Sequence, residues 1–507
     1  MKKFIIYCSF ILSAFVVMTS CVKDKGNYDY IDLPELYIDT VGQQVSFQVY
    51  QNATLRINPK VEYTGDASKL KYLYFIHGST PQAFDTISTE KNLEYVVTKA
   101  PGTYTMRLEV IAENGVRAFM PYRFEVLPAF SSGWMVLYER ADNPGTSEID
   151  IIRSPRFVTG ATDTVYRATY GAYNEKTLPG TPRSILYRTS SPDILVATSQ
   201  TAVSMQRTDL RELQTFDMLF AYPPPPNTSL NQILVGSFGD HFLFANNAGY
   251  WATSGLFVGE LTISGGVELA PFIYPMFGRA GGVFDKKKRR FLMAQQWTNV
   301  MLAYPDATGT PQAGQPNKPP LFNLNNIGRD LLFVDKTAGR NATTNDAYKL
   351  AIFKDISGPG RYVYIFDTQL ADTDPGVKLL DITSAPEIQD ALFYATPNVG
   401  RMVMYGTSEK VYGFIYSNID DSYTTPAPLF TAPAGEVITD MKLYKTTNTA
   451  GGLETEPRDF FVATWNESLK KGYVYHFKVD EAAGAINSTG SKWTVDGKIG
   501  AMYFKAQ

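Results

Sequence analysis

Cysteine and histidine are nearly absent from this chain of 507 residues, which contains 2 cysteines and 3 histidines. Cys8 lies within an N-terminal apolar segment and Cys21 directly follows it, so the rest of the chain has no cysteine pair that could form a disulfide bond. The histidines, His77, His241 and His476, are far apart and show none of the spacings of metal ligands. The sequence therefore predicts no disulfide, no thiol catalysis and no metal site.

The lack of a large net charge and of catalytic motifs reduces the number of possible functions further. Lysine and arginine total 47 against 50 aspartate and glutamate residues, and this balance gives no electrostatic reason to expect nucleic acid as a partner. No Gly-x-Ser-x-Gly elbow, phosphate-binding loop or dinucleotide-binding glycine motif occurs, so no cofactor and no catalytic residue is predicted. Paired carboxylates for glycoside hydrolysis stay open, because a sequence does not give their separation in space.

A pattern of three short strand-like runs recurs about seven times between Trp134 and the C-terminus. The clearest copy consists of residues 390–396, 401–407 and 410–417, whose connections are too short for a crossover helix. The copies follow one another at intervals of about 47 to 61 residues. Aromatic-rich strands in such a repeat predict an all-β protein with a β-propeller of about seven blades.

The repeat also predicts how the ring closes. Residues 133–139 and 147–153 match the second and third strands of a blade that lacks a first strand, whereas residues 498–505 match a first strand that lacks its blade. The C-terminal strand is therefore expected to close the propeller, which removes a free sheet edge. With strands named A to D from the innermost outward, the other first strands are expected to begin near Arg183, Asn231, Ala280, Arg329, Gln389 and Ile438.

Upstream of the repeat, apolar and polar residues alternate in strand fashion, as in residues 45–50 and 104–111. About 95 residues of this kind are typical of an immunoglobulin-like β-sandwich. The expected domain organisation is a signal peptide over residues 1–20, a tether over 21–33, a β-sandwich over 34–128 and the propeller over 129–507.

The N-terminus predicts a lipid anchor. Lys2 and Lys3 precede an apolar run over residues 4–18, which is short for a membrane span. The ending Met18-Thr-Ser-Cys21 has the small residues of a lipobox, so cleavage before Cys21 and acylation of its sulfur are expected. An ordinary cleaved secretion signal is the alternative. The polar, glycine-containing residues 22–30 suit a flexible tether between lipid and domain.

Two segments resemble known families. Residues 100–115, with a Pro-Gly turn before a tyrosine-containing strand and an Asn-Gly turn after it, resemble the last hairpin of a polycystic-kidney-disease-type (PKD) domain. Residues 18–30 resemble the start of surface lipoproteins of the Bacteroidota. The chain is thus similar to PKD-like family lipoproteins, a group associated with polysaccharide utilisation. The resemblance implies an outer-membrane location, with polysaccharide and neighbouring uptake-system proteins as partners, and it supplies no catalytic residue.

Candidate ligand-binding residues lie on the loops expected at the upper face of the propeller, where the B-to-C and D-to-A connections emerge. Aromatic rings there could stack on sugars and amides could bind hydroxyl groups, although the same rings could instead pack between blades. Trp297 and Trp465 are assigned to equivalent B-to-C turns, and the basic residues 286–290 to a solvated A-to-B hairpin on the lower face. The full set is Trp297, Trp465, Tyr222, Phe272, Tyr274, Phe277, Asn246, Asn247 and Asn466.

Three classes of function remain on the sequence alone. A non-catalytic glycan-binding or accessory lipoprotein of the outer membrane is favoured, because the tether, the sandwich and the aromatic loops occur together without a catalytic motif. An adhesin or protein-interaction subunit is the second class, since propellers present broad faces. A propeller glycosidase or lyase is the third.

The anchor prediction is testable by one substitution. Cys21→Ser removes the sulfur that signal peptidase II and the acyltransferases require, so the variant should lose palmitate and either leave the membrane fraction or accumulate as an uncleaved precursor. Radiolabelled palmitate incorporation checks this. Labelling that persists in the Cys21→Ser protein would refute acylation at that residue.

Overall fold

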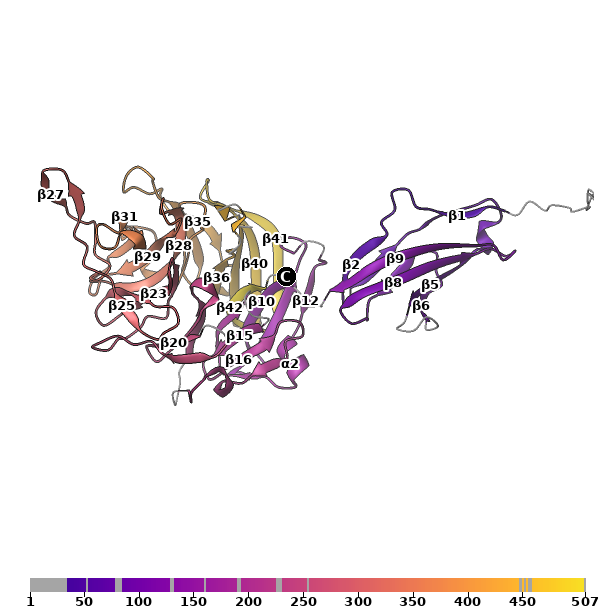
Figure 1. The fold of residues 1–507 in the computed structure, drawn as a ribbon, viewed down its shortest axis with the longest axis horizontal. Helices are drawn as coiled ribbons and strands as arrows, with labels where there is room; N and C mark the ends of the chain where they lie inside the picture. The colour runs from indigo at the N-terminus through magenta and orange to yellow at the C-terminus, as the bar shows by residue number, and fades with distance from the viewer. Residues whose placement is uncertain are drawn as a thin grey trace, which may run out of the picture. The chain divides into compact units, whose positions relative to one another are not determined.

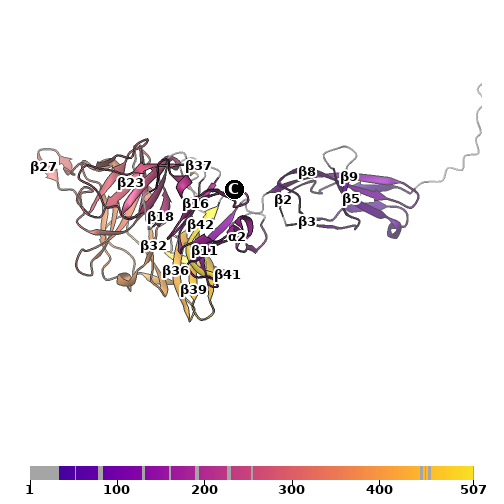
Figure 2. The same ribbon diagram turned by 90° about the horizontal axis from the view of Figure 1, so that it is seen from below.

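The computed structural model describes residues 34–51, 53–77, 84–127, 132–158, 161–188, 193–224, 230–252, 255–445, 449–450, 453–454 and 458–505. The expected signal peptide, the tether and Cys21 lie outside these residues. The chain divides into two compact units, Met1–Leu127 and Pro128–Gln507, and each is considered by itself. Figures 1 and 2 show the strands of both units.

The first unit is a two-layer β-sandwich. One layer is a five-stranded sheet in the order β2 (Ser46–Tyr50), β9 (Arg117–Leu127), β8 (Gly102–Ile111), β5 (Lys71–His77) and β6 (Phe84–Ser88). The other layer contains two strand pairs, β1 (Leu36–Asp39) with β4 (Lys60–Tyr63) and β3 (Thr54–Ile57) with β7 (Leu93–Val96). Side chains of both layers form one apolar core, which confirms the predicted sandwich.

Strand β9 shows how the sequence specifies this layer. Its residues alternate without exception between exposed and buried up to its last residue, with Met120, Tyr122 and Phe124 in the core and Phe119 and Pro121 on the opposite face. Because successive side chains of a strand point to opposite sides, this period of two fixes the register of the sheet.

The second unit contains seven sheets of at least four strands within its described residues, and each sheet is one blade. Strands A to D of blade 1 are β42 (Gly497–Lys505), β10 (Gly133–Arg140), β11 (Thr146–Arg153) and β12 (Thr164–Tyr166), and those of blade 2 are β14 (Pro182–Tyr187), β15 (Asp193–Thr198), β16 (Ala202–Gln206) and β17 (Glu212–Gln214). Those of blade 3 are β18 (Leu230–Val235), β19 (His241–Ala245), β20 (Ala248–Ala252) and β21 (Phe257–Glu260). Those of blade 4 are β22 (Tyr274–Met276), β23 (Arg279–Asp285), β24 (Arg290–Ala294) and β25 (Met301–Ala303).

Blades 5 to 7 follow the same order: β28 (Asp330–Arg340), β29 (Ala347–Lys354), β30 (Arg361–Phe366) and β31 (Gly376–Asp381); β32 (Phe393–Ala395), β33 (Met402–Gly406), β34 (Lys410–Ile415) and β35 (Ala427–Thr431); β36 (Glu436–Leu443), β39 (Asp459–Asn466), β40 (Lys471–Asp480) and β41 (Ala485–Val495). First strands of neighbouring blades contact each other, as β42 does with β14 and β36. The sheets therefore surround a common axis as a seven-bladed propeller, as predicted (Figure 1).

The C-terminal strand closes the ring. Strand β42 pairs with β10 in antiparallel fashion, with Trp134 opposite Phe504. The buried indole of Trp134 stacks on Phe461 of blade 7 at a centroid distance of 3.8 Å, and its Nε1–H donates to the sulfur of Met502 at 3.3 Å. Blade 1 is thus built from both ends of the propeller sequence, which confirms the predicted closure.

The register predicted for blade 4 is wrong by one strand. Ala280 lies in the second strand, β23, because the three-residue strand β22 precedes it and joins it through the turn at Phe277 and Gly278. The ring of Tyr274 occupies the space beside Gly282, where an added Cβ would lie 1.9 Å from that ring. A strand this short, with a proline in its middle, lacks the alternation that identifies strands in a sequence.

Helical structure is sparse. Among its described residues, the propeller unit contains one α-helix of six residues, α2 (Thr169–Asn174), and short 3-10 turns such as η2 (Asp217–Leu219). Among the described residues, no helix has the length and apolar character required to cross a membrane. A two-stranded hairpin, β26 (Thr310–Gln312) and β27 (Gln315–Lys318), projects from the connection between blades 4 and 5, and all its strand residues are exposed (Figure 1).

Ring closure predicts a large loss of stability when β42 is removed. Deleting residues 498–507 uncovers an edge of β10 and removes a buried strand, in a class of fold whose net stability is usually about 5 to 15 kcal/mol. The truncated protein should be insoluble or melt many degrees lower in differential scanning calorimetry. Deleting the exposed residues 310–318 is the control and should change the melting temperature little. Equal melting of the first truncation and the full chain would contradict closure by β42.

Candidate functional site

The propeller presents two loop faces. Because its strands run antiparallel, the B-to-C turns and D-to-A connections emerge at one face, here called upper, and the A-to-B and C-to-D connections at the other, here called lower. The corrected register of blade 4 places the basic residues 286–289 in a B-to-C turn at the upper face. It places Phe277 and Trp297 at the lower face, opposite to the prediction.

On the upper face, Trp465 and Asn466 are the last two residues of β39, directly before the turn to β40. Trp465 is only 6% exposed, and its Nε1–H donates to the carboxylate of Glu467 at 2.7 Å. The side-chain oxygen of Asn466 accepts a hydrogen bond from the backbone N–H of Leu469 at 3.0 Å. The prediction that Trp297 and Trp465 occupy equivalent turns is therefore wrong, and Trp465 presents no open ring to solvent.

Other predicted residues of the upper face lie on blade 3 and on the connections that precede and follow it. Asn246 and Asn247 form the two-residue turn between β19 and β20, with φ of 51° and 65°, which asparagine tolerates well. The side-chain oxygen of Asn247 accepts from Lys286 of blade 4 at 2.6 Å. Tyr222, in the connection that follows η2, is exposed, whereas Phe272 is half-buried against the core between blades 4 and 5.

Tyr274, predicted on a loop, is a fully buried residue of β22. Its hydroxyl lies 3.3 Å from that of Tyr304, and the Tyr304 hydroxyl is 3.2 Å from the sulfur of Met276. Burial, followed by the neighbouring Tyr304, raises the pKa of Tyr274 well above its usual value. This residue supports the junction of blades 4 and 5 from within.

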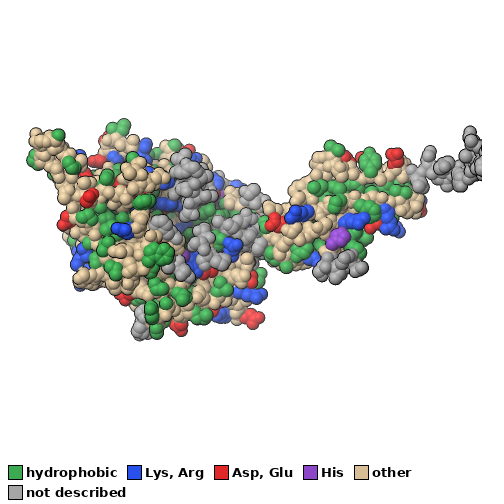
Figure 3. All heavy atoms as spheres, viewed as in Figure 1, with side chains coloured by type: hydrophobic (Ala, Val, Ile, Leu, Met, Phe, Trp, Pro, Cys, Tyr) green, Lys and Arg blue, Asp and Glu red, His purple; other side chains and the backbone are tan. Residues whose placement is uncertain are grey.

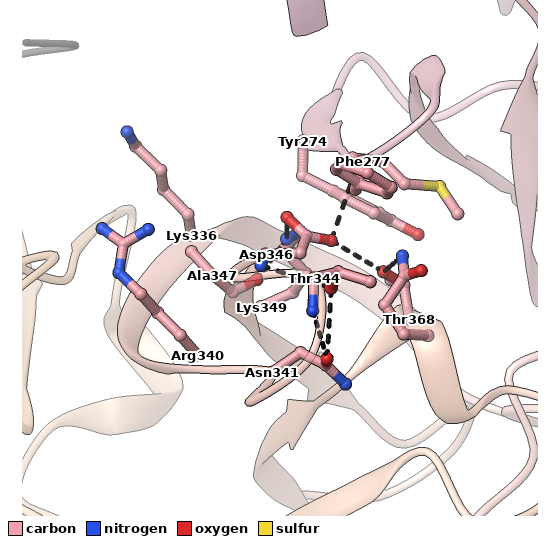
Figure 4. Close-up of polar contacts among 12 residues, drawn as sticks. Tyr274, Phe277, Lys336, Arg340, Asn341, Thr344, Asp346, Ala347, Lys349 and Thr368 are labelled. Carbon is pink, nitrogen blue, oxygen red and sulfur yellow. Dashed lines mark hydrogen bonds and ion pairs between the residues drawn. The ribbon is translucent and has the colours of Figure 1, made fainter. Parts of the chain in front are cut away.

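At the lower face, Asp346 ties blade 4 to blade 5 (Figure 4). One carboxylate oxygen accepts from Lys349 Nζ at 3.0 Å, and the other accepts from Thr368 Oγ1 at 3.2 Å and from the backbone N–H of Phe277 at 3.4 Å. Phe277 itself, at the tip of the β22–β23 turn, is 56% exposed. One carboxylate therefore fixes the backbone that carries an exposed aromatic ring.

The partner of this carboxylate is a buried lysine. Lys349 is 1% exposed, and burial lowers its pKa against the opposing effect of Asp346. Its ammonium group also donates to the backbone oxygen of Ala347. Asn341 organises the same A-to-B loop by accepting from the backbone N–H of Thr344 at 2.9 Å. An amine so enclosed braces the loop and does not face solvent as a nucleophile.

Trp297 is the outlier of the lower face. It lies between β24 and β25, is 76% exposed and has a φ of 64°. The left-handed region costs a non-glycine residue about 1 to 2 kcal/mol, and an exposed ring returns no burial energy. The other four tryptophans of the chain, Trp134, Trp251, Trp465 and Trp493, are all buried. The left-handed conformation of Trp297 therefore lowers the stability of the fold, which points to a role outside folding.

The histidines do not form a site. His77 is exposed in the first unit, and His241 and His476 are buried in blades 3 and 7. Neither ring nitrogen of His241 has a hydrogen-bond partner among the described residues, and burial, aided by the charge of Arg188, lowers its pKa to about 3. No group of three or more His, Cys, Asp or Glu side chains able to hold a metal ion occurs in the part of the chain that the structure describes.

The contacts by which Asp346 and Lys349 support the turn of Phe277 were not predicted from the sequence. Asp346 and Lys349 lie three residues apart at the start of a strand, a spacing that also occurs in ordinary surface pairs. Only the fold shows that the pair is buried and linked to blade 4. The signal that could have identified the strain at Trp297 is a bulky residue within a short turn, where glycine or asparagine is usual.

Comparisons with known proteins place these features in context. A family model described as the PKD-like family matches residues 21–182, which cover most of the first unit and the start of the propeller. No curated protein matches the chain significantly.

Among solved structures, the chain is similar to a quinonprotein alcohol dehydrogenase-like protein from Bacteroides thetaiotaomicron, with 13% identity and a TM-score of 0.42 over 94% of this chain and 100% of that one. It is also similar to the β-propeller domain of Cps50 from Myceliophteria thermophila, with 10% identity and a TM-score of 0.36 over 64% of this chain and 89% of that one. Likenesses at these values carry no information about activity.

The buried His241 predicts acid sensitivity. Its folded pKa lies below the unfolded value of about 6.5, so the unfolded state binds more protons and stability falls as the pH drops from 6.5 toward 3. The loss between pH 6.5 and 5 should be about 1.5 kcal/mol.

Urea unfolding at both pH values measures this loss. His241→Leu should abolish that share of the pH dependence, and His77→Leu, which changes an exposed histidine, should retain it. An unchanged pH dependence in His241→Leu would contradict the proposed burial of a neutral ring.

Proposed function

We propose that this protein is a non-catalytic binding protein, anchored through an acylated Cys21 in the outer membrane, that holds a polysaccharide at the lower face of its propeller. The observation that carries the proposal is Trp297, a ring that is mostly exposed and held in a strained conformation. Phe277 is the second exposed aromatic side chain on the lower side of the same blade. The PKD-like and propeller folds fit a protein-interaction or accessory role, and the ligand class is our inference.

The chemistry around Trp297 favours a neutral sugar polymer. Its turn, residues 295–300, contains glutamine, threonine and asparagine but no charged side chain. A flat indole offers an apolar face to the C–H surface of a sugar ring, while amides exchange hydrogen bonds with hydroxyl groups. The brace formed by Asp346 and Lys349 holds Phe277 without occupying the ring itself.

The absence of catalysis is part of the proposal and rests on how the charged groups are engaged. Near Phe277, Asp346 accepts three hydrogen bonds and Lys349 is enclosed. On the opposite face, the Glu467 carboxylate is shared by Trp465 and Lys470. Each of these groups completes a structural contact, and the Trp297 turn itself contains no charged side chain.

A protein partner is the alternative, and one observation favours it. The outer strands of blades 2 to 4 expose apolar side chains on the rim of the propeller, namely Leu213 of β17, Val258 of β21 and Leu302 of β25. Exposed apolar patches frequently mark protein-binding surfaces. Under this reading the chain is an adhesin or an interaction subunit of an uptake system.

Trp297→Ala separates binding from folding. An exposed ring adds little to the folded state, so the melting temperature should stay the same, while binding to a polysaccharide retained by the wild type should weaken by about 1 to 3 kcal/mol, the scale of aromatic stacking on nucleobases. Trp297→Gly should melt at the same or a higher temperature, because glycine adopts a positive φ freely. Affinity electrophoresis and calorimetry measure the two effects.

Trp465→Ala is the matched control. Removing this buried ring should cost about 3 to 5 kcal/mol of folding stability and change polysaccharide binding only as far as unfolding does. Full retention of affinity in Trp297→Ala, or a fall in its melting temperature as large as that of Trp465→Ala, would overturn the proposed site and favour the protein-partner alternative.

A further inference from the structure

The first unit carries an aromatic and cationic surface on the side of its five-stranded sheet that faces away from the core. Phe75 of β5 lies directly opposite Arg107 of β8, and His77 lies opposite Phe84 of β6. Phe119 stands on the same side of β9. We call these five residues the outer sheet face. Figure 3 shows histidine, basic and hydrophobic side chains gathered on this unit.

Three of its rings pack against one another, with Phe75 buried beneath the exposed His77 and Phe84. The ring centroids of Phe75, His77 and Phe84 are 5.1 to 5.5 Å apart in edge-to-face contacts. Phe84 and Phe119 remain largely exposed. In a sandwich the outward side of a sheet is normally polar, so exposed rings at these positions are unexpected for folding alone.

The side chain of Arg107 is held in place by two rings of the outer sheet face, those of Phe119 and Phe75. Its guanidinium carbon lies 3.7 Å from the centroid of Phe119 and 5.9 Å from that of Phe75. Within the described residues, no hydrogen bond or ion pair uses its N–H groups. A planar guanidinium that is fixed by stacking and keeps its donors unused is a preformed fork for a carboxylate or another oxyanion.

The charges on the same side of the sheet favour an anionic occupant. Glu109, two residues beyond Arg107 on β8, is engaged by Arg117 at 2.7 Å. Lys71 and Arg123 stand on the same side and form no ion pair among the described residues. Glu125 of β9 also faces this side, but the cations outnumber the acids, so positive charge is in excess on this side of the sheet.

We propose that the outer sheet face is a second binding site, which takes an acidic polysaccharide. The carboxylate or sulfate group of one sugar binds the guanidinium of Arg107, and the apolar ring faces of the polymer lie on the exposed aromatic rings. An acidic peptide shares the anion but lacks the flat ring, so the rings favour carbohydrate. This site lies in the first unit and is independent of Trp297.

Binding of defined polymers to the full chain, purified in detergent, tests this site. The probes are polygalacturonate, which carries carboxylates, dextran sulfate, which carries sulfates, neutral dextran, and polyglutamate, which is an anionic peptide. We expect polygalacturonate or dextran sulfate to bind, at least about tenfold more tightly than dextran and polyglutamate. The stronger of the two identifies the anion.

Arg107→Lys and Arg107→Gln should each weaken that binding about tenfold or more, because lysine keeps the charge but loses the planar fork. Arg123→Gln is the matched control, since it removes one charge from the same side of the sheet without disturbing a ring contact, and it should change affinity less than about threefold. Thermal melting of each variant verifies that the first unit is folded.

Three results would overturn the proposal. Equal loss of affinity in Arg107→Gln and Arg123→Gln would show a diffuse electrostatic effect. Equal binding of polyglutamate would show an anionic peptide site. Binding of no acidic polymer above the level of dextran would show that the outer sheet face does not recognise anions. Trp297→Ala should leave polygalacturonate and dextran sulfate binding unchanged, which separates this site from the one on the propeller.

Discussion

The pairing of β42 with β10 is the constraint on which the second unit depends. The first and last blades of a propeller are far apart in the sequence. Here the C-terminal strand joins them, because it supplies the innermost strand of blade 1. Trp134 then joins that blade to blade 7 through its stack on Phe461. Because the closed ring fixes the inner strands, short turns on both faces can hold strained or exposed residues without loss of the fold.

The two units present different surfaces. In the propeller, buried polar contacts such as that of Asp346 with Lys349 stabilise loops, and Trp297 presents the exposed ring that we propose as the binding surface. In the first unit, the sheet itself presents rings and Arg107 on its outward side. Under the two proposals, the uncharged turn of Trp297 takes a neutral polysaccharide and the cationic outer sheet face takes an acidic one.

Much of the fold follows from the sequence, because alternation and turn residues specify strands and their order. The closure of the ring by residues 498–505 is an example, since two incomplete strand sets fit each other. The strands of blade 4 were not predicted correctly, because β22 has only three residues, one of them a proline. The predicted register was therefore off by one strand, and Trp297 lies on the lower face and not on the upper face. Burial at the end of a strand, as for Trp465, and an enclosed ion pair, as for Lys349, depend on packing between blades that no local pattern encodes.

The exposure of Trp297 allows a direct measurement without any substitution, because it alone of the five tryptophans is open to solvent. Acrylamide quenching of the intrinsic fluorescence of the full chain should therefore find one readily accessible tryptophan and four protected ones. Saturation with a neutral polysaccharide that the protein retains should abolish the accessible fraction. An accessible fraction that persists in the saturated complex would show that the ligand does not cover Trp297, and would contradict the central claim.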